Sequence, residues 1–275
     1  MSKQIEAINE FHRLHESGCF VLPNPWDPGS TIVLEHLGFK AVATTSAGYA
    51  FARGLPDGGV PLTDMLAHFR EIAAATSLPV NADFLNCFAD DPAGVSENVT
   101  ACISTGVAGL SIEDSTGNDA TPLYEFNLAV ERVRAARAAI DASGANVVLT
   151  ARCEAYLVGD PDAFRTSIDR LTAFAAAGAD CLYAPGVTQP DEIAAIVKAV
   201  TPKPINVLVF MKNCELTFPE LEDLGVRRIS LGSSLARAAW SGLLTLATEI
   251  QEAGKFTSLD KATTFDFNGL FRRRG

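Results

Sequence analysis

Acidic side chains follow several short apolar runs of the chain, in positions where they could bind a metal ion. Asp57 lies in a glycine-rich turn, Asp83 and Glu113 each end an apolar run, and Arg152 ends another. Carboxylates that lie close together repel one another unless a cation separates them. A hard cation such as Mg²⁺ takes few carboxylates and completes its shell with waters and substrate oxygens. The pattern therefore indicates a Mg²⁺ site, with Arg152 placed to bind a carboxylate or phosphoryl group of the substrate.

A turn of small residues, Thr44-Thr-Ser-Ala-Gly48, follows another apolar run. Its hydroxyls and backbone N–H groups are suited to binding a carboxylate.

Each of the acids named above also has a plainer interpretation, because acids cap helices and form surface ion pairs. Asp114, for example, is expected to cap the turn that follows it. The recurrence of polar residues at successive segment ends favours a site over separate caps.

Cysteine and histidine usage argues against other kinds of catalytic centre. Cys87 and Cys153 lie near the same segment ends, but neither has a Lys or His close in sequence to lower its pKa, so we expect packed, unreactive thiols. All four histidines lie in the first quarter of the chain, without the spacing of a catalytic triad or a three-histidine metal site. The six cysteines form no CxxC pair, which favours a reduced, cytoplasmic protein.

The elements that would position these residues alternate regularly along the chain. Glycines at 38, 106, 178 and 225 mark points where a helical pattern ends and an apolar run begins. Continuous apolar runs are typical of parallel strands covered on both faces. Eight such units in 275 residues fit a (β/α)8 TIM barrel, in which catalytic residues follow the carboxyl ends of the strands. The predicted strands are 20–22, 41–44, 79–83, 109–112, 147–151, 181–183, 205–209 and 228–231, and the clearest predicted helices are 61–75, 122–140 and 162–177.

A doubly wound open sheet is the alternative α/β architecture, but the glycine-rich dinucleotide fingerprint is absent after the first predicted strand. No linker or shift in composition divides the chain. We therefore predict one barrel domain over residues 1–255 and a C-terminal extension over residues 256–275, where the pattern stops.

Composition restricts the class of partner. Hydrophobic residues make up 48% of the chain and charged residues 20%, which suffices for a sizeable buried core. The formal net charge of −11 disfavours nucleic acid, and the basic run Arg272–Arg274 is expected to be a solvated tail. No stretch approaches the roughly 18–20 apolar residues that span a membrane, and the polar first residues do not resemble a signal peptide.

Several motifs, in order, resemble the isocitrate lyase and phosphoenolpyruvate mutase superfamily. The likeness covers all eight predicted strands. The segment from Gly225 to Arg237 is most similar to the phosphonomutase-like branch. The other motifs are Ser46-Ala-Gly48, Gly54-Leu-Pro-Asp57, Pro79-Val-Asn-Ala-Asp83, Gly109-Leu-Ser-Ile-Glu113-Asp114 and Thr150-Ala-Arg152-Cys-Glu154-Ala.

The resemblance implies Mg²⁺ at the barrel mouth, and an eighth helix exchanged between the subunits of a homodimer or homotetramer. Asp83 would bind the metal directly, while Asp57 and Glu113 would reach it through water. Arg152 would meet the anionic end of a small 2-oxo acid. Asp57, Glu113 and Arg152 would together be the catalytic residues. The shared chemistry is the making or breaking of a C–C or P–C bond beside a carbonyl, through an enolate. The implied substrate-binding residues, besides Arg152, are Trp26, Thr45, Ser46, Ala47 and Gly48.

The chain departs from the family pattern at three places. Leu85 stands where relatives carry a second acid, which should weaken Mg²⁺ binding by roughly 10–100-fold, although Asn86 offers a neutral oxygen. The Lys-Lys-Cys-Gly-His segment of the lyases is missing after Glu113, so cleavage of isocitrate or methylisocitrate is not expected. The segment Tyr183-Ala-Pro-Gly186 lacks the histidine of phosphonate-cleaving relatives, which favours C–C over P–C chemistry.

The resulting hypothesis is a Mg²⁺-dependent lyase-type enzyme that acts on a small 2-oxo (di)carboxylic acid, similar to oxaloacetate or 2-oxoglutarate, by C–C cleavage or decarboxylation. One alternative is a 2-oxo acid binding protein with weak or lost catalysis, which the leucine at position 85 suggests. The other is P–C bond chemistry on phosphonopyruvate or phosphoenolpyruvate.

Overall fold

Eight parallel strands form a nearly closed barrel in the computed structural model, which describes residues 3–210 and 215–272. The strands follow the order β1-β8-β7-β6-β5-β4-β3-β2. A hydrogen bond of 3.0 Å from the Ala43 N–H to the Pro23 carbonyl joins the two end strands. The strands are β1 (Phe20–Leu22), β2 (Val42–Ala43), β3 (Val80–Asp83), β4 (Gly109–Glu113), β5 (Val148–Arg152), β6 (Cys181–Tyr183), β7 (Ile205–Leu208) and β8 (Arg228–Ser230).

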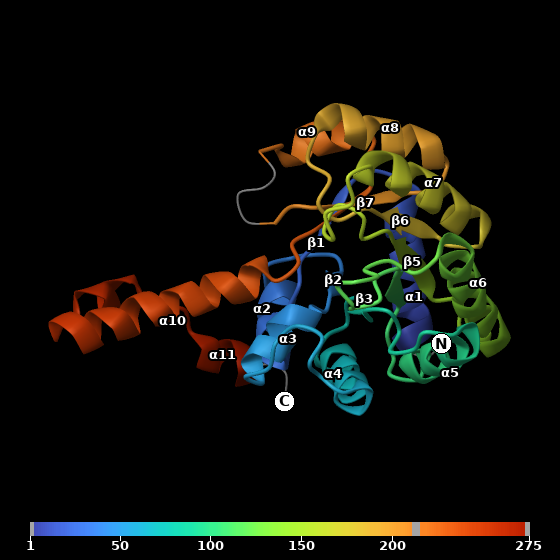
Figure 1. Cartoon of the computed structure of the whole chain (residues 1–275). Coiled ribbons are helices and arrows are strands. Elements are labelled where there is room, and N and C mark those ends of the chain that lie inside the picture. Colours follow the sequence, from blue (N-terminus) through green and yellow to red (C-terminus); the bar gives the residue numbers. More distant parts are fainter. Residues whose placement is uncertain (1–2, 211–214, 273–275) are drawn as a thin grey trace.

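The TIM-barrel prediction is confirmed, and each predicted strand is present with its ends shifted by at most one residue. Helices surround the sheet (Figure 1). They are α1 (Lys3–Glu16), α2 (Pro28–His36), α3 (Ser46–Ala52), α4 (Leu62–Ala75), α5 (Pro92–Ile103), α6 (Phe126–Ser143), α7 (Ala163–Ala176), α8 (Pro190–Val200), α9 (Phe218–Asp223), α10 (Ser234–Ala253) and α11 (Phe267–Arg272), with a 3₁₀ helix at Thr257–Lys261. The glycines at 38, 106, 178 and 225 all have positive φ, as their predicted role at helix ends requires.

The predicted start of the helix at residue 122 is wrong. The Thr116 N–H donates to the Pro122 carbonyl at 2.9 Å, which pairs this segment with the preceding loop instead. Helix α6 begins at Phe126, because the Glu125 side chain caps it by accepting hydrogen bonds from the backbone N–H groups of Asn127 and Leu128.

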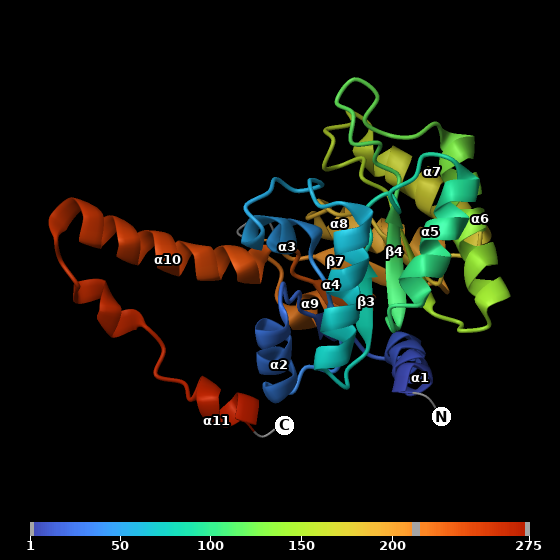
Figure 2. The same cartoon turned by 90° about the horizontal axis from the view of Figure 1, so that it is seen from below.

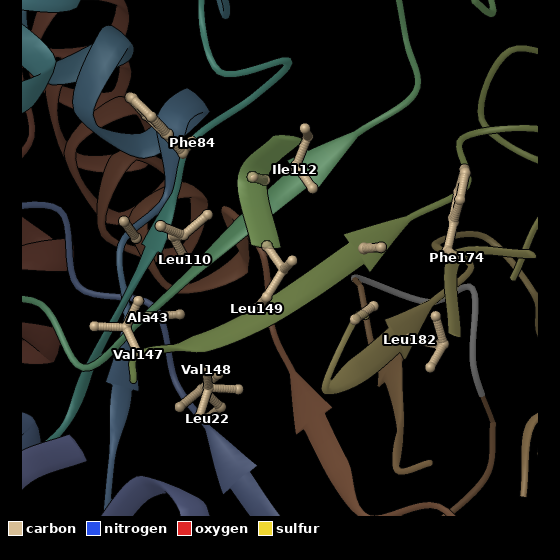
Figure 3. Packing of buried hydrophobic residues seen from close by; sticks show 14 of the residues in the cluster. Leu22, Ala43, Phe84, Leu110, Ile112, Val147, Val148, Leu149, Phe174 and Leu182 are labelled. Atoms are coloured by element: carbon tan, nitrogen blue, oxygen red, sulfur yellow. The ribbon is translucent and has the colours of Figure 1, made fainter. Parts of the chain in front are cut away.

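The core lies inside the barrel and between its strands and helices (Figure 3). Leu110, Leu149 and Leu182 from neighbouring strands are fully buried there. Helix α1 covers the amino ends of the strands, where the Phe11 ring packs so closely against Gly109 that a Cβ at position 109 would lie 2.7 Å from it. This packing leaves the carboxyl ends of the strands as the open mouth of the barrel.

Helix α10 projects away from the barrel, and the chain then turns back so that α11 lies beside α2 (Figures 1 and 2). Of the α10 side chains, only Ala236 is buried, while Trp240, Leu243 and Leu244 are exposed. In the predicted C-terminal extension, the Phe265 ring lies 5.8 Å from the His36 ring of α2. Cys214, one of the six cysteines, and Arg273 and Arg274 of the C-terminal basic run lie outside the described residues. None of the described helices has the length and hydrophobicity needed to cross a bilayer.

Candidate active site

A cavity of about 270 Å³ opens at the carboxyl ends of the strands and brings together most of the predicted site. Its size is at the lower end of the range for small-molecule sites, roughly 300–1,000 Å³. The predicted residues that line it are Thr45, Ser46, Ala47, Asp57, Asp83, Glu113 and Arg152.

Arg152 is the centre of the charge network in this cavity. Its guanidinium lies 2.8 Å from an Asp83 oxygen, 3.4 Å from a Glu113 oxygen and 2.8 Å from a Glu154 oxygen. Strand pairing produces this arrangement, because Glu113 at the end of β4 stands directly beside Arg152 at the end of β5. The guanidinium also lies 5.0 Å from the centre of the Tyr183 ring on β6.

Asp83 is fixed at both of its carboxylate oxygens. One oxygen pairs with Arg152, and the other accepts a hydrogen bond of 2.9 Å from the Ser46 N–H. The Asp83 N–H itself donates to the Thr44 hydroxyl at 2.9 Å. These bonds tie the end of β3 to the start of α3, so the metal-binding candidate and the predicted carboxylate-binding turn are neighbours. That turn is the first turn of α3, capped by the Thr45 hydroxyl.

Crowded carboxylates shift the acid–base properties of the cavity. Burial, and then the charge of Asp83, raise the pKa of Asp57. Burial raises the pKa of Glu113 well above its usual range, even though Arg152 lowers it, and burial likewise raises the pKa of Glu154. Burial would lower the pKa of Arg152, but the carboxylates of Glu154, Glu113 and Asp83 outweigh it and raise this pKa. The crowding of these groups therefore makes it costly for all of the carboxyl groups to be ionised at once without a further cation.

Besides Arg152, the cavity lining contains a second cation that the sequence pattern did not indicate. Arg228, on β8, also lines the cavity and is 2% exposed. Its guanidinium donates to the Asn206 side-chain oxygen at 2.8 Å and to the Thr150 hydroxyl at 3.0 Å. Burial lowers the pKa of Arg228. The feature of the sequence that could have indicated this role is the presence of a charged residue, Arg228, within the predicted strand 228–231.

Asp114 does not cap its own turn, in contrast to the prediction. It is buried, and one oxygen accepts the Glu154 N–H at 2.8 Å while the other accepts from Arg170 at 3.0 Å. Arg170 reaches from α7 and also donates to the Tyr124 carbonyl at 2.8 Å. Asp114 thus joins the carboxyl ends of β4 and β5 to an outer helix.

Two of the predicted substrate-binding residues, Trp26 and Gly48, do not line the cavity. A Cβ at position 48 would lie 2.6 Å from a Thr45 methyl and 3.3 Å from the Trp26 Cβ, so these residues pack closely behind the site. The thiols of Cys87 and Cys153 are fully buried, as expected, and burial raises the pKa of each.

The donor set fits a divalent cation, although the described residues contain no group of three or more His, Cys, Asp or Glu side chains that already converges as a metal cage. The cavity lining carries the carboxylates of Asp57, Asp83, Glu113 and Glu154 against two guanidinium groups. An anionic substrate therefore needs additional positive charge to enter. Mg²⁺ is commonly held by one or two carboxylates and several waters, which Asp83, with Asp57 and Glu113 around it, can supply.

The eight-stranded parallel barrel and the cavity at the carboxyl ends of its strands define the class of protein, a TIM-barrel enzyme. A family model described as phosphoenolpyruvate phosphomutase matches residues 11–251. The chain therefore belongs to this family, within the isocitrate lyase and phosphoenolpyruvate mutase superfamily of lyases and mutases. Enzymes of this superfamily typically depend on a divalent metal.

Solved structures and curated relatives agree with this assignment. A provisionally assigned lyase or mutase of Burkholderia cenocepacia J2315 superposes with a TM-score of 0.95, is 44% identical, and each chain is covered over 98% of its length. Oxaloacetate acetylhydrolase in complex with its product oxalate gives a TM-score of 0.86 at 25% identity, covering 97% of this chain and 94% of the other. The oxaloacetate decarboxylase of Paraburkholderia xenovorans is 32% identical over 196 residues, which are 68% of this chain and 63% of the relative.

Proposed function

We propose that this protein is a Mg²⁺-dependent lyase that breaks a C–C bond beside the carbonyl of a small 2-oxo acid, by retro-aldol cleavage or decarboxylation. The observation that carries the proposal is the position of Arg152, flanked by Asp83, Glu113 and Glu154 in one cavity with the first turn of α3. Relatives named for oxaloacetate chemistry support the substrate class.

In this scheme Asp83 would hold the metal, with Asp57 and Glu113 directed at its waters. Bound there, the metal would supply Lewis-acid stabilisation of negative charge on the oxo group. The first turn of α3 presents backbone N–H groups that have no partner within the helix, and Ala47 carries one of them into the cavity lining. Because the Ser46 N–H already donates to Asp83 and the Gly48 N–H to the Thr45 hydroxyl, the Ala47 N–H is the one that would bind the substrate carboxylate.

Arg152 would neutralise charge that develops on the substrate as the C–C bond breaks. It is preorganised for this role, because three carboxylates and the Tyr183 ring fix its orientation before any substrate enters. Cleavage of a C–C bond is preferred over cleavage of a P–C bond because no histidine stands at the end of β6 to contact a phosphoryl group. The residues there are Tyr183, the last of β6, and Ala184.

The test is turnover of a panel of 2-oxo acids with Mg²⁺, by wild type, Asp83→Asn and Asp169→Asn. Asp169 provides a matched control, because its side chain is 61% exposed on α7 and pairs only with Arg165, at 3.8 Å. We expect Mg²⁺-dependent turnover of at least one 2-oxo acid, a loss of 100-fold or more in Asp83→Asn, and no change in Asp169→Asn.

Mg²⁺-dependent binding of oxo acids without turnover of any panel member would favour the binding-protein alternative. Turnover in which phosphonopyruvate is the best substrate would favour P–C chemistry. Equal activity of wild type and Asp83→Asn would refute the assigned metal role.

We also propose that α10 packs against a second copy of the chain, in a homodimer or homotetramer with exchanged helices. The exposed apolar residues Trp240, Leu243 and Leu244 on the projecting helix support this. Leu243→Glu combined with Leu244→Glu should reduce the mass measured by light scattering to that of a monomer. An unchanged mass would refute exchange through this face.

The cysteines of the described residues are all free thiols, which suits a reducing compartment such as the cytoplasm.

A further inference from the structure

The rim of the active-site cavity combines its charged floor with an apolar wall. Leu85 follows β3, Leu157 follows β5, and Leu208 and Phe210 lie at the end of β7. All four line the same cavity as Asp83 and Arg152. We define these four residues as the apolar wall.

The wall is part of a defined local structure. Leu85 adopts a left-handed backbone conformation with φ of 50°, which is unfavourable for a residue with a branched side chain, and its carbonyl accepts the Glu113 N–H at 3.0 Å. Leu208 and Phe210 pack over Gly232, where an added Cβ would lie 3.2 Å from Leu208 and 3.6 Å from Phe210. Cys87 and Phe88 share the left-handed conformation, so the whole turn after β3 holds the Leu85 side chain at the cavity.

Charge limits what can contact this wall. Among the described residues, the cations in the cavity lining are Arg152, which already pairs with three carboxylates, and Arg228, which is bonded to Asn206 and Thr150. Arg237 lies nearby, 5.8 Å from the Phe210 ring, but it bonds to the Ser233 hydroxyl and lines a different cavity with Phe51 and Trp240. Within the described part of the lining, a second carboxylate on the substrate would therefore find cations that already have partners, beside apolar side chains and acids.

Cavity size leaves room for more than the reacting group. A volume of about 270 Å³ corresponds to roughly nine water molecules at their liquid volume, more than a three-carbon oxo acid displaces. The apolar wall contributes apolar surface to this same cavity. Resting on the retro-aldol form of the proposed function, we infer that the substrate is a 4-hydroxy-2-oxo monocarboxylate with an uncharged aliphatic tail seated against Leu85, Leu157, Leu208 and Phe210. Cleavage of its C3–C4 bond would convert the hydroxyl-bearing carbon, with its tail, into an aldehyde and release the hydroxyl proton. The remaining enolate would take up a proton to give pyruvate.

The test is calorimetric measurement of Kd on the full chain with saturating Mg²⁺ for pyruvate, 2-oxopentanoate and 2-oxoglutarate. The last two have the same chain length and differ in a terminal methyl against a terminal carboxylate. Each buried methylene should tighten binding about fourfold, so 2-oxopentanoate should bind roughly tenfold or more tightly than pyruvate. It should also bind at least tenfold more tightly than 2-oxoglutarate.

Variants show whether the wall is responsible. Leu157→Ser combined with Leu208→Ser should bring the Kd of 2-oxopentanoate to within about twofold of that of pyruvate, while leaving the pyruvate Kd unchanged. Leu157→Ser alone should produce part of this effect, and because Leu157 is 55% exposed this variant should fold normally. Leu37→Ser is the control, since Leu37 is 64% exposed at the end of α2 and does not line the cavity.

The two ways of failing are distinct. If pyruvate binds with Mg²⁺ but 2-oxoglutarate binds as tightly as 2-oxopentanoate, the inferred tail is wrong and the proposed function stands. A tail preference that persists in both wall variants also overturns the inference. If none of the three acids binds with Mg²⁺, the proposed function fails and the inference fails with it.

Discussion

The buried pair between Asp114 and Arg170 makes a quantitative prediction about how α7 supports the active site. Arg170→Met would leave the Asp114 carboxylate buried at 3% exposure, without its cation and with the Glu154 N–H and the Cys153 thiol as hydrogen-bond partners. It would also remove a donor from the Tyr124 carbonyl. Removing one partner of a buried ion pair costs about 3–5 kcal/mol, because the remaining charge is neither solvated nor paired. For a chain of this size, about 1 kcal/mol lowers Tm by roughly 2–4 °C.

The same helix offers a matched control. Arg165→Met removes the pair with Asp169, whose nitrogen–oxygen distance is 3.8 Å and whose side chains are 85% and 61% exposed. Such surface pairs contribute about 0–1 kcal/mol. We therefore expect chemical and thermal unfolding to show a Tm loss of roughly 6–20 °C for Arg170→Met and at most a few degrees for Arg165→Met.

The pH dependence of this loss provides a second readout. Burial raises the pKa of Asp114, and Arg170 partly opposes that shift, so Arg170→Met should raise this pKa further. A carboxyl whose folded-state pKa is raised is least favourable when ionised, and its cost decreases as pH falls through that pKa. The difference between Arg170→Met and wild type should therefore narrow toward acid pH. Equal stability losses in Arg170→Met and Arg165→Met would refute the reasoning.

Two further predictions concern a buried histidine and the altered position in the mouth. Burial lowers the pKa of His68 to about 4, so the native state binds fewer protons than the unfolded state between pH 6.5 and 4, and the free energy of unfolding should fall by about 3 kcal/mol as pH falls through this window. His68→Phe can keep the stacking on Tyr49 but cannot titrate. Denaturant titrations at several pH values should therefore show that this variant lacks that part of the stability loss. Leu85→Asp should tighten Mg²⁺ binding roughly 10–100-fold in calorimetry and weaken the preference for an aliphatic tail. With Mg²⁺ bound, Tm should not fall, because the metal offsets the added charge and Asp tolerates the left-handed backbone better than Leu; unchanged metal affinity would contradict the role assigned to this position.

Strand positions were predictable from the sequence because parallel strands covered on both faces leave continuous apolar runs. Asp83, Glu113 and Arg152 were predictable as mouth residues for the same reason, since they stand at the ends of those runs. The helix over 122–140 was placed too early, because its apolar pattern continues across Leu123 and Tyr124. Those residues instead pair with the preceding loop, through tertiary contacts that periodicity does not report.

The polar side chains of Asn206 and Arg228, which line the cavity from the strands, could not be predicted from the sequence. Strands of two to five residues are too short to show which positions face the barrel interior, so Asn206 and Arg228 were indistinguishable from residues facing the helices. Asp114 was read as a cap because its partner Arg170 is 56 residues away in the chain. The apolar wall was missed for a related reason, since Leu157 and Phe210 lie in loops whose positions depend on the completed barrel.

The leucine at position 85 and the charge network around Arg152 are physically linked. The mouth already holds four carboxylates against two guanidinium groups, and burial raises the pKa of Asp57 and Glu113. A further acid at position 85 would add to this repulsion, and only a bound metal could offset it. Leucine there removes one like charge and adds apolar surface to the cavity. We therefore expect the leucine at this position both to lower the affinity for the metal and to move substrate preference toward an uncharged tail.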